Sequence, residues 1–195
     1  MKDKAMTTRI VNIRHHTPHH TDRFFIDTNV WFWLTYAASN EIQTQNAPIR
    51  YQLEAYPNFI EKILDEGANI YHSPLALSEL ANIIERTEYD IYLSNHSVHL
   101  TRKQFRKETE HRKKVMQEVS NAWQQITQMS ETLDITLNKE LSTKALTTLS
   151  EHQLDAYDAF YIESMSRYNV TNIVTDDSDF NGLDISLYTA NNQLV

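Results

Sequence analysis

The amino-acid sequence predicts an α/β fold in which helices cover both faces of a parallel sheet. Short apolar runs typical of buried strands alternate with stretches of helical periodicity, and the connections suit right-handed crossovers. The 195 residues include only two glycines and four prolines, which favours helix between the strands. A chain of this length forms one domain of ordinary size.

The first predicted unit is the stretch RFFIDTNVWFWL, residues 23–34. Its apolar run is typical of a buried strand, and it ends at Asp27, followed by two residue types that begin helices. Asp27 is therefore expected where a strand meets a helix, at the sheet edge where open α/β folds bind ligands. A simple helix N-cap is an equal alternative for this carboxylate.

The later elements follow from apolar spacing and turn residues. Gly67 is expected to end the helix before it as a C-cap. The predicted elements are a helix over 51–66, a strand over 68–74, a helix over 75–86, a strand over 133–138, helices over 139–149 and 154–168, and strands over 172–177 and 184–190. The count is five strands, all expected to be parallel.

Residues 88–130 are expected to be a helical insertion within a single domain that spans 23–195. One packed seam is predicted for its C-terminal half, formed by Val115, Val119, Ala122, Ile126 and Met129. The half before it has only Phe105 as a seam residue. We expect one long helix whose C-terminal half docks and whose N-terminal half is exposed.

The N-terminal half of the insertion is strongly basic. Residues 101–114 carry seven Lys or Arg against two Glu, a net charge of +5, although the whole chain has −8. The basic segment 102–114 is a candidate for phosphate contacts, with the side chains Lys103, Arg106, Lys107, Arg112, Lys113 and Lys114. A solvated helix face is an equal alternative, and docking of an acidic partner is another.

Residues 1–22 are expected to be a flexible tail. The run HHTPHH places His15, His16, His19 and His20 within six positions, and nothing periodic anchors them. Adventitious metal chelation by the clustered histidines is the minority interpretation.

The composition excludes several classes of protein. No cysteine is present, which excludes disulfides, thiolate zinc sites and cysteine nucleophiles and fits a reducing cytosol. No apolar run approaches the roughly 20 residues of a membrane span, and the N-terminus lacks the apolar core of a signal peptide. A soluble, cytoplasmic protein without membrane contact is expected.

Four carboxylates occupy positions where a carboxylate is a poor structural choice: Asp27, Glu79, Asp158 and Asp177. Each has an ordinary explanation, as an N-cap, a solvated helix rim, a dipole partner or a turn. Strand ends of one parallel sheet meet at one edge, however, so these acids should converge and repel unless a cation lies among them. An all-oxygen ligand set selects Mg²⁺ or Mn²⁺, as one or two ions.

The ordered set FIDTN, SELANIIER and DAFYIESMSRYNVTNIVTDDSDF resembles the PIN-domain ribonuclease family, whose best-known members are toxins of bacterial toxin–antitoxin pairs. The resemblance implies a three-layer α/β/α sandwich with a five-stranded parallel sheet of order 3-2-1-4-5. It also implies a Mg²⁺ or Mn²⁺ site and cleavage of single-stranded RNA, with an antitoxin and a second copy of the chain as further partners. The long helical insertion departs from the short members of the family.

By position, Asp27, Glu79, Asp158 and Asp177 resemble the four acids of that family. Asn29 and Thr175 would support them through hydrogen bonds. Asp155-Ala156 also matches the Asp-Ala pair of the third acid, but Asp158 has the better spacing to Thr175. Asp176 and Asp179 are expected to be outer partners of the site or only solvated.

Metal-assisted hydrolysis of RNA phosphodiesters is therefore the main functional hypothesis. One alternative is a non-catalytic module of the same fold that binds RNA or protein, although all four acidic positions are filled. Another is an aspartyl-phosphate protein with Asp27 as nucleophile. Haloacid-type phosphatases would have an Asp where this chain has Asn29.

Overall fold

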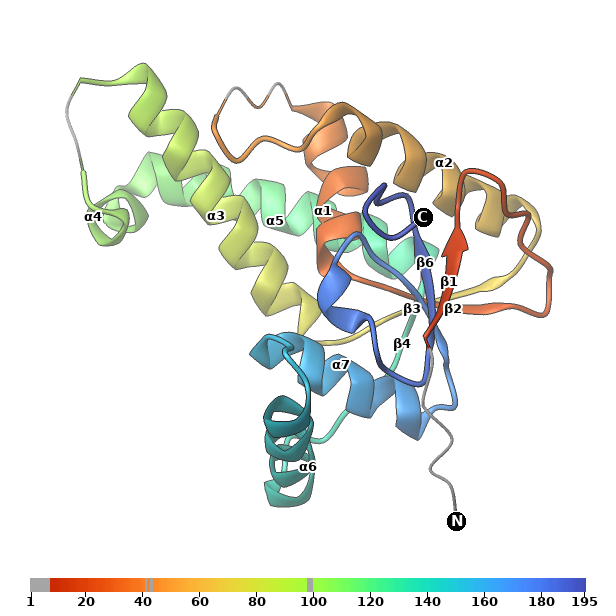
Figure 1. Cartoon of the computed structure of the whole chain (residues 1–195). Coiled ribbons are helices and arrows are strands. Elements are labelled where there is room, and N and C mark those ends of the chain that lie inside the picture. Colours follow the sequence, from red (N-terminus) through yellow and green to blue (C-terminus); the bar gives the residue numbers. More distant parts are fainter. Residues whose placement is uncertain (1–7, 41, 43, 98–99) are drawn as a thin grey trace, which may run out of the picture.

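The computed structural model describes residues 8–40, 42, 44–97 and 100–195. These residues form a six-stranded parallel sheet of order β1-β6-β5-β2-β3-β4 (Figure 1). The strands are β1 (Arg9–Asn12), β2 (Arg23–Ile26), β3 (Asn69–His72), β4 (Glu131–Thr132), β5 (Asn172–Val174) and β6 (Ser186–Thr189).

Helices connect the strands and supply the outer layers. The α-helices of the described residues are α1 (Thr28–Thr35), α2 (Arg50–Asp65), α3 (Ala76–Asn95), α4 (Arg102–Lys107), α5 (Thr109–Met129), α6 (Lys139–Glu151) and α7 (Ala156–Arg167). Two short 3-10 helices, η1 (Ala37–Ser39) and η2 (Ser178–Phe180), complete the set. None of the described helices is long and apolar enough to cross a membrane.

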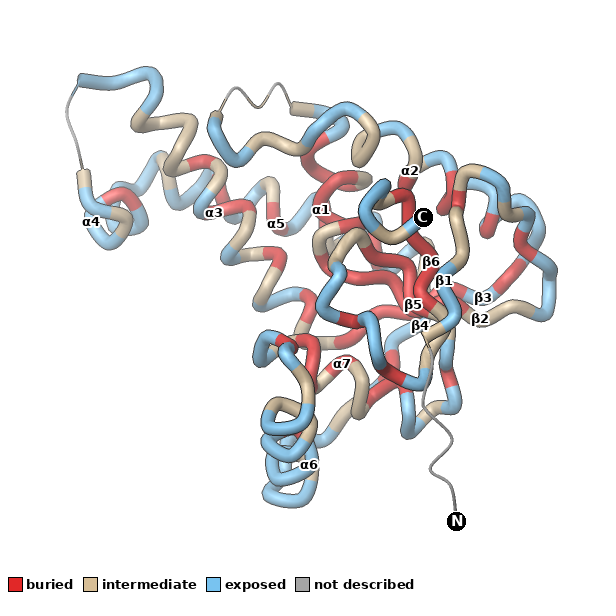
Figure 2. The backbone as a smooth tube through the Cα atoms, viewed as in Figure 1, coloured by how far each residue is buried: buried red, intermediate tan, exposed pale blue. Residues whose placement is uncertain are grey.

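The sheet separates two hydrophobic cores because successive side chains of a strand point to opposite faces. Phe24 and Ile26 of β2 pack in the core that includes α1, α2, α3 and α5. Phe25 packs in the other core, where its ring lies 5.2 Å from that of Tyr161 on α7. Figure 2 shows the buried residues concentrated in the sheet and on the inner sides of the helices. The predicted α/β class with a parallel sheet is confirmed.

The predicted count of five strands is wrong. β1, within the segment expected to be a tail, pairs with β6 from Arg9↔Ser186 to Asn12↔Thr189. The next residues are also anchored: Ile13 is 1% exposed, and the His16 ring lies 5.1 Å from that of Tyr188. The chain gains this packing by covering the otherwise open edge of β6. The predicted tail is therefore structured over residues 8–22, while residues 1–7 lie outside the described part.

The other five strands follow the expected order 3-2-1-4-5, but the third one is shifted. β4 is only Glu131–Thr132, whereas a strand was predicted over 133–138. The Leu133 amide still bonds to the His72 carbonyl at 2.9 Å, and the chain then leaves the sheet. Leu137 is 60% exposed, and the Asn138 side chain caps α6, so the apolar alternation there does not mark a strand.

The insertion is not one long helix. The helix predicted over 75–86 continues as α3 to Asn95, and the basic segment turns back as α4 and α5. Glu108 separates these two with an extended backbone, φ −70° and ψ 121°. The buried Phe105 ring joins the three helices at this turn, because it stacks on His111 of α5 and contacts Tyr89 of α3.

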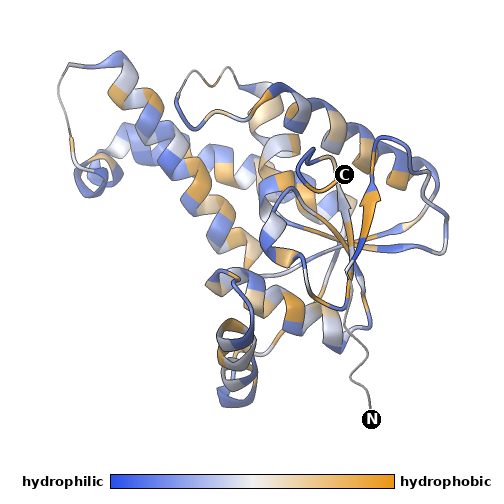
Figure 3. Ribbon diagram, in the orientation of Figure 1, coloured by the Kyte–Doolittle hydropathy of each residue, from blue (hydrophilic) through white to orange (hydrophobic). Residues whose placement is uncertain are grey.

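The C-terminal half of the insertion docks as predicted. Val115, Val119, Ala122 and Ile126 of α5 are buried in the core shared with α1 and α3. Apolar and polar positions alternate along α3 and α5 in Figure 3, as expected for helices with one buried face. The predicted seam is therefore the docking face of α5.

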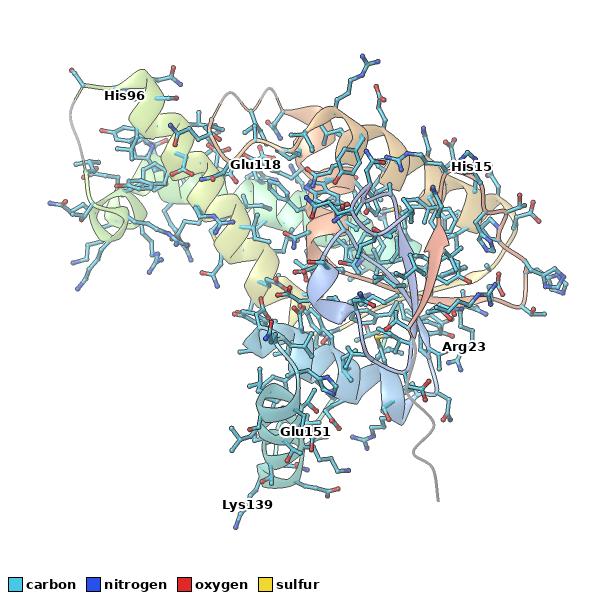
Figure 4. All side chains as sticks on the ribbon, in the orientation of Figure 1. His15, Arg23, His96, Glu118, Lys139 and Glu151 are labelled. Atoms are coloured by element: carbon cyan, nitrogen blue, oxygen red, sulfur yellow. The ribbon has the colours of Figure 1, made fainter. Side chains whose placement is uncertain are left out.

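Two further features bear on the sequence predictions. Gly67 adopts φ of +68° directly after α2, which is the C-cap geometry expected from its position. In Figure 4, Lys139 and Glu151 mark the two ends of α6, which projects from the α7 side of the sheet. Only Ala145 of α6 is buried, so this helix adds little to the core.

Candidate active site

Asp27 lies at the carboxyl end of the central strand β2 and is 2% exposed. It occupies the N-cap position of α1, yet its side chain makes no capping hydrogen bond. Instead, the Thr175 hydroxyl donates a hydrogen bond to Asp27 Oδ2 at 2.8 Å. A carboxylate acting as a simple N-cap would accept from the first turn of its own helix. The N-cap explanation therefore does not account for this buried charge.

Thr175 connects two of the predicted acids. It follows β5 directly, and its hydroxyl also accepts a hydrogen bond from the Asp177 backbone N–H at 3.0 Å. Asp177 in turn begins the 3-10 helix η2, where its Oδ1 accepts from the Asp179 N–H at 2.8 Å. The turn after β5 thus holds Asp177 at the same end of the sheet as Asp27.

Glu79 in the first turn of α3 is held by two hydroxyl groups. Tyr161 Oη donates to Glu79 Oε2 at 2.6 Å, and Tyr161 Oη lies 2.9 Å from Thr28 Oγ1. Because Tyr161 has only one hydroxyl proton, Thr28 is the donor in the second bond. The chain from Thr28 through Tyr161 orients Glu79 toward the junction of β2 and α1. Glu79 is therefore not a freely solvated residue at a helix rim.

Asp155 and Asp158 have different surroundings in α7. Asp155 is exposed, and its side chain caps the helix by accepting from the backbone N–H groups of Tyr157 and Asp158. Asp158 is 5% exposed, and the charges of Asp27, Asp155, Asp177 and Glu79 repel its carboxylate. Asp158 thus belongs to the carboxylate cluster, whereas Asp155 has the capping role at its border.

Asp176 points away from this cluster. Its carboxylate accepts hydrogen bonds from the hydroxyls of Tyr51 and Tyr56 and from Gln52 Nε2, which fastens α2 to the end of β5. Asp179 is exposed and contributes its backbone N–H to Asp177. The structure therefore gives both extra acids structural contacts.

The four clustered carboxylates have raised pKa values. Burial raises the pKa of Asp27 to about 7, repulsion from Glu79 and Asp177 adds to the rise, and the Thr175 hydrogen bond opposes it. Burial and then repulsion from Asp27 and Asp155 raise the pKa of Asp158 to about 9. Burial is also the largest cause of the raised pKa values of Glu79 and Asp177. Ionisation of these groups is thus costly without a nearby positive charge.

The donor chemistry of the cluster fits a hard divalent cation, because all four side chains supply carboxylate oxygens. In the described residues no Lys or Arg forms an ion pair with any of the four. Their side chains do not form a closed ligand set, however. In the part of the chain that the structure describes, no three or more His, Asp or Glu residues form a group that could hold a metal ion as they stand.

A cleft with a volume of about 300 Å³ opens beside the cluster. Asn29, Glu79, Arg86 and Arg102 are among the residues that line it. Asn29 was predicted to support the acids, and its place at the mouth of this cleft is compatible with that role. An extended chain can therefore approach the carboxylates along a surface that carries both amide and guanidinium groups.

The basic segment is less free than the sequence indicates. Arg106 and Arg112 form ion pairs with Glu85, Lys114 with Glu88, and Lys113 with Glu110. Glu85 and Glu88 are buried residues of α3, 5% and 4% exposed. Lys103 and Lys107 are exposed on α4 and form none of the ion pairs found among the described residues.

Four contributors to the site escaped the sequence predictions: Thr28, Tyr161, Arg86 and Arg102. Tyr161 lies three residues after Asp158, so both share one face of α7, and this spacing was an available signal. Arg86 lies seven residues after Glu79, again on one helix face. Arg102 reaches the cleft only through the fold of the insertion, which no local pattern reveals.

Comparison with known proteins is decisive for the family. The family model of the PIN domain matches residues 24–185. The chain belongs to the PIN-domain family. The matched range includes all four clustered acids and the whole insertion, and it begins after β1. A comparison with curated proteins finds no match.

PIN domains are commonly nucleases and generally use divalent metal ions. Membership therefore supports a nuclease-type fold for this chain and favours the nuclease hypothesis over an aspartyl-phosphate protein. The arrangement at the sheet edge agrees with that assignment in one respect. The four acids, of which Asp27 and Asp158 are buried, come from four separate elements of a PIN fold, which local helix capping would not require.

Proposed function

We propose that this PIN-domain protein is a Mg²⁺- or Mn²⁺-dependent endoribonuclease that hydrolyses phosphodiester bonds of single-stranded RNA. The observation that carries the proposal is the meeting of Asp27, Glu79, Asp158 and Asp177 at one sheet edge. These residues would hold the metal. When bound, one or two divalent ions would stabilise charge on the phosphoryl and leaving oxygens and activate a water molecule.

The chain itself would position the ligand oxygens. Thr175 holds Asp27 by a hydrogen bond to Oδ2, and Tyr161 holds Glu79 by a hydrogen bond to Oε2. Supporting groups of this kind fix the orientation of metal ligands and tune their basicity.

The acidic cluster alone repels RNA, so the approach of the substrate requires positive charge elsewhere. We propose that the basic segment of α4 and α5 supplies it. Arg106, Arg112 and Lys114 contribute from fixed positions, because buried carboxylates hold them, while Lys103, Lys107 and Lys113 contribute from the exposed surface. Contacts of this kind position phosphates without reading bases.

A toxin within a toxin–antitoxin pair is the finer form of this proposal, with an antitoxin protein and a second copy of the chain as partners. It rests on membership in the PIN-domain family, whose best-known members have that role. The gene adjacent to this one tests it: a small neighbouring reading frame whose product binds the protein and suppresses its activity would support the toxin assignment.

A non-catalytic PIN module that binds RNA or protein is the second candidate. It is favoured by one observation, that the described acids do not form a closed ligand set as they stand. The test incubates purified protein with labelled single-stranded RNA in Mg²⁺, Mn²⁺ or EDTA, beside Asp27→Asn. Cleavage that needs the metal and Asp27 supports the nuclease; binding without cleavage supports the module.

A further inference from the structure

The cleft beside the carboxylate cluster is lined by groups of both charges. Glu79 and Asp155 contribute carboxylates, and Arg86 and Arg102 contribute guanidinium groups. Arg86 lies outside the basic segment 102–114, and Arg102 is its first residue but was not among the side chains named there as RNA contacts. Their position next to the acids raises the question of which ligand they serve.

Arg102 is delivered to the cleft by a buried anchor. Its Nε donates to Glu85 Oε1 at 2.9 Å, and its guanidinium also donates to the Asn82 carbonyl at 3.3 Å. Glu85 and Asn82 both belong to α3. These two contacts fix the guanidinium at the edge of the cleft, so little side-chain entropy is lost when it binds a ligand.

Glu85 pairs with more than one arginine, so its single negative charge does not neutralise all of them. Arg106 donates to it through Nε at 2.7 Å, and Arg112 NH1 lies 3.6 Å from its Oε2. One carboxylate therefore faces three guanidinium groups, which leaves a net charge of +2. The three side chains are 37%, 49% and 49% exposed, so the excess charge is accessible from solvent.

Arg86 adds a guanidinium from α3 itself. It lies on the same helix face as Glu79, seven residues away, and it is exposed. It forms none of the ion pairs found among the described residues. A planar guanidinium without a carboxylate partner suits bidentate recognition of a phosphate.

We propose that Arg86 and Arg102 form a phosphate-binding subsite for the nucleotide that flanks the scissile bond, with the RNA backbone continuing toward Arg106 and Arg112. The subsite rests on the proposed ribonuclease function and names where its substrate lies. In this proposal the helical insertion forms part of the substrate cleft through Arg102, in addition to supplying positive charge near it. Because its contacts are to phosphate, it favours no base sequence.

The test measures binding of a fluorescent single-stranded RNA dodecamer in Ca²⁺ and in EDTA between about 50 and 200 mM KCl. The Arg86→Gln/Arg102→Gln variant is compared with Lys62→Gln/Lys139→Gln, which removes the same charge from exposed positions on α2 and α6. Loss of two phosphate contacts should flatten the log–log salt slope by about 1.4, while the control keeps the wild-type slope. Equal slopes in all three proteins would overturn the subsite.

The single variant Arg86→Gln controls for misfolding of the double variant, because Arg102 pairs with the buried Glu85 whereas Arg86 does not. This single variant should flatten the slope by about 0.7 and keep the wild-type melting temperature. A glutamate-rich peptide serves as a competitor. Displacement of the RNA by the peptide at equal charge concentration would reassign the cleft to an acidic protein and overturn the RNA subsite.

Failure of the subsite and failure of the ribonuclease function give different results. If the wild-type protein cleaves RNA but Arg86→Gln binds RNA with the wild-type salt slope, the subsite alone is refuted. If Arg86→Gln shows the predicted change in salt slope in Ca²⁺, but the wild-type protein does not cleave RNA in Mg²⁺ or Mn²⁺, the subsite is supported and the nuclease is refuted.

Discussion

The Thr175 hydroxyl donates to Asp27 Oδ2 at 2.8 Å, across the boundary between β5 and β2. The bond joins residues 148 positions apart in the chain. It diverts the Asp27 carboxylate from the helix that it begins and fixes it among three other acids. We therefore regard this hydrogen bond as the structural element that defines the candidate active site.

Replacement of Thr175 by Val should remove that bond while keeping the shape of the side chain. The buried Asp27 oxygen and the Asp177 amide both lose a partner, at a cost of about 1–3 kcal/mol in the free energy of unfolding. RNA cleavage should fall by at least about tenfold, as is typical for loss of a group that orients a metal ligand. Thr175→Ser keeps the hydroxyl and serves as the control; equal loss in both variants would contradict this role.

Removal of one buried carboxylate should stabilise the metal-free protein. At about pH 8, above the pKa of about 7, Asp27→Asn eliminates the cost of burying the carboxylate charge and its repulsion with Glu79 and Asp177, and a gain of 1 kcal/mol corresponds to about 2–4 °C in the melting temperature. The same variant should lose most of the stabilisation that Mg²⁺ gives to the wild type. Thermal melts with EDTA and with Mg²⁺ measure both effects, and exposed Asp184→Asn is the control. A lower melting temperature in EDTA would contradict the repulsion.

The metal-free protein should lose stability as the pH rises. The folded pKa values of Asp27 and Asp158 are about 7 and about 9, above the value near 4 of an unfolded Asp. Between these values the folded state holds protons that the unfolded state has released, so these two groups lower the stability as the pH rises. The lowered pKa values of His72 and His16 act in the opposite direction below about pH 6.5, so the net loss of stability is expected between about pH 7 and pH 9. Melts in EDTA across this range test the sign. The Asp27→Asn/Asp158→Asn variant should flatten the curve, and a wild-type melting temperature that rises with pH would refute the assignment.

Glu85 should be essential for the fold of the insertion. Glu85→Gln removes the charge that holds Arg102, Arg106 and Arg112, and breaking a partly buried ion cluster of this kind costs about 1–3 kcal/mol. The matched control is Glu54→Gln, which removes a carboxylate from the exposed Arg50 pair and should leave the unfolding midpoint unchanged. Urea unfolding compares the two, and equal midpoints would show that the cluster is not structural.

Much of the site could be predicted from the sequence because its acids lie at ends of predicted elements. Asp27 and Asp177 follow apolar runs, and Glu79 and Asp158 share helix faces with apolar residues. The sequence could not decide whether Asp27 was an N-cap, since its partner Thr175 is remote. Only the family resemblance separated Asp177 from Asp176, because the Asp176 carboxylate bonds to Tyr51 and Tyr56 of a distant helix, which no local pattern reveals.

The parts of the fold that were missed depend on long-range pairing. The strand β1 is the short segment RIVN beside a histidine-rich run, and it is stabilised by β6 near the other end of the chain. At the break between α4 and α5, Phe105 packs against Tyr89 and Tyr92 of α3, residues that are distant from it along the helix pattern of the insertion. The role of Glu85 was not predicted either, because its three arginine partners come from the insertion.

The most direct test of the proposed active site compares neighbouring acids of α7 in one RNA cleavage assay. Asp158→Asn removes a buried member of the cluster, whereas Asp155→Asn alters its border and keeps a residue that caps helices well. In saturating Mg²⁺ we predict that Asp158→Asn lowers the cleavage rate by at least about 100-fold and that Asp155→Asn lowers it by less than about tenfold. Equal rates for the two variants, or the greater loss in Asp155→Asn, would contradict the proposed site.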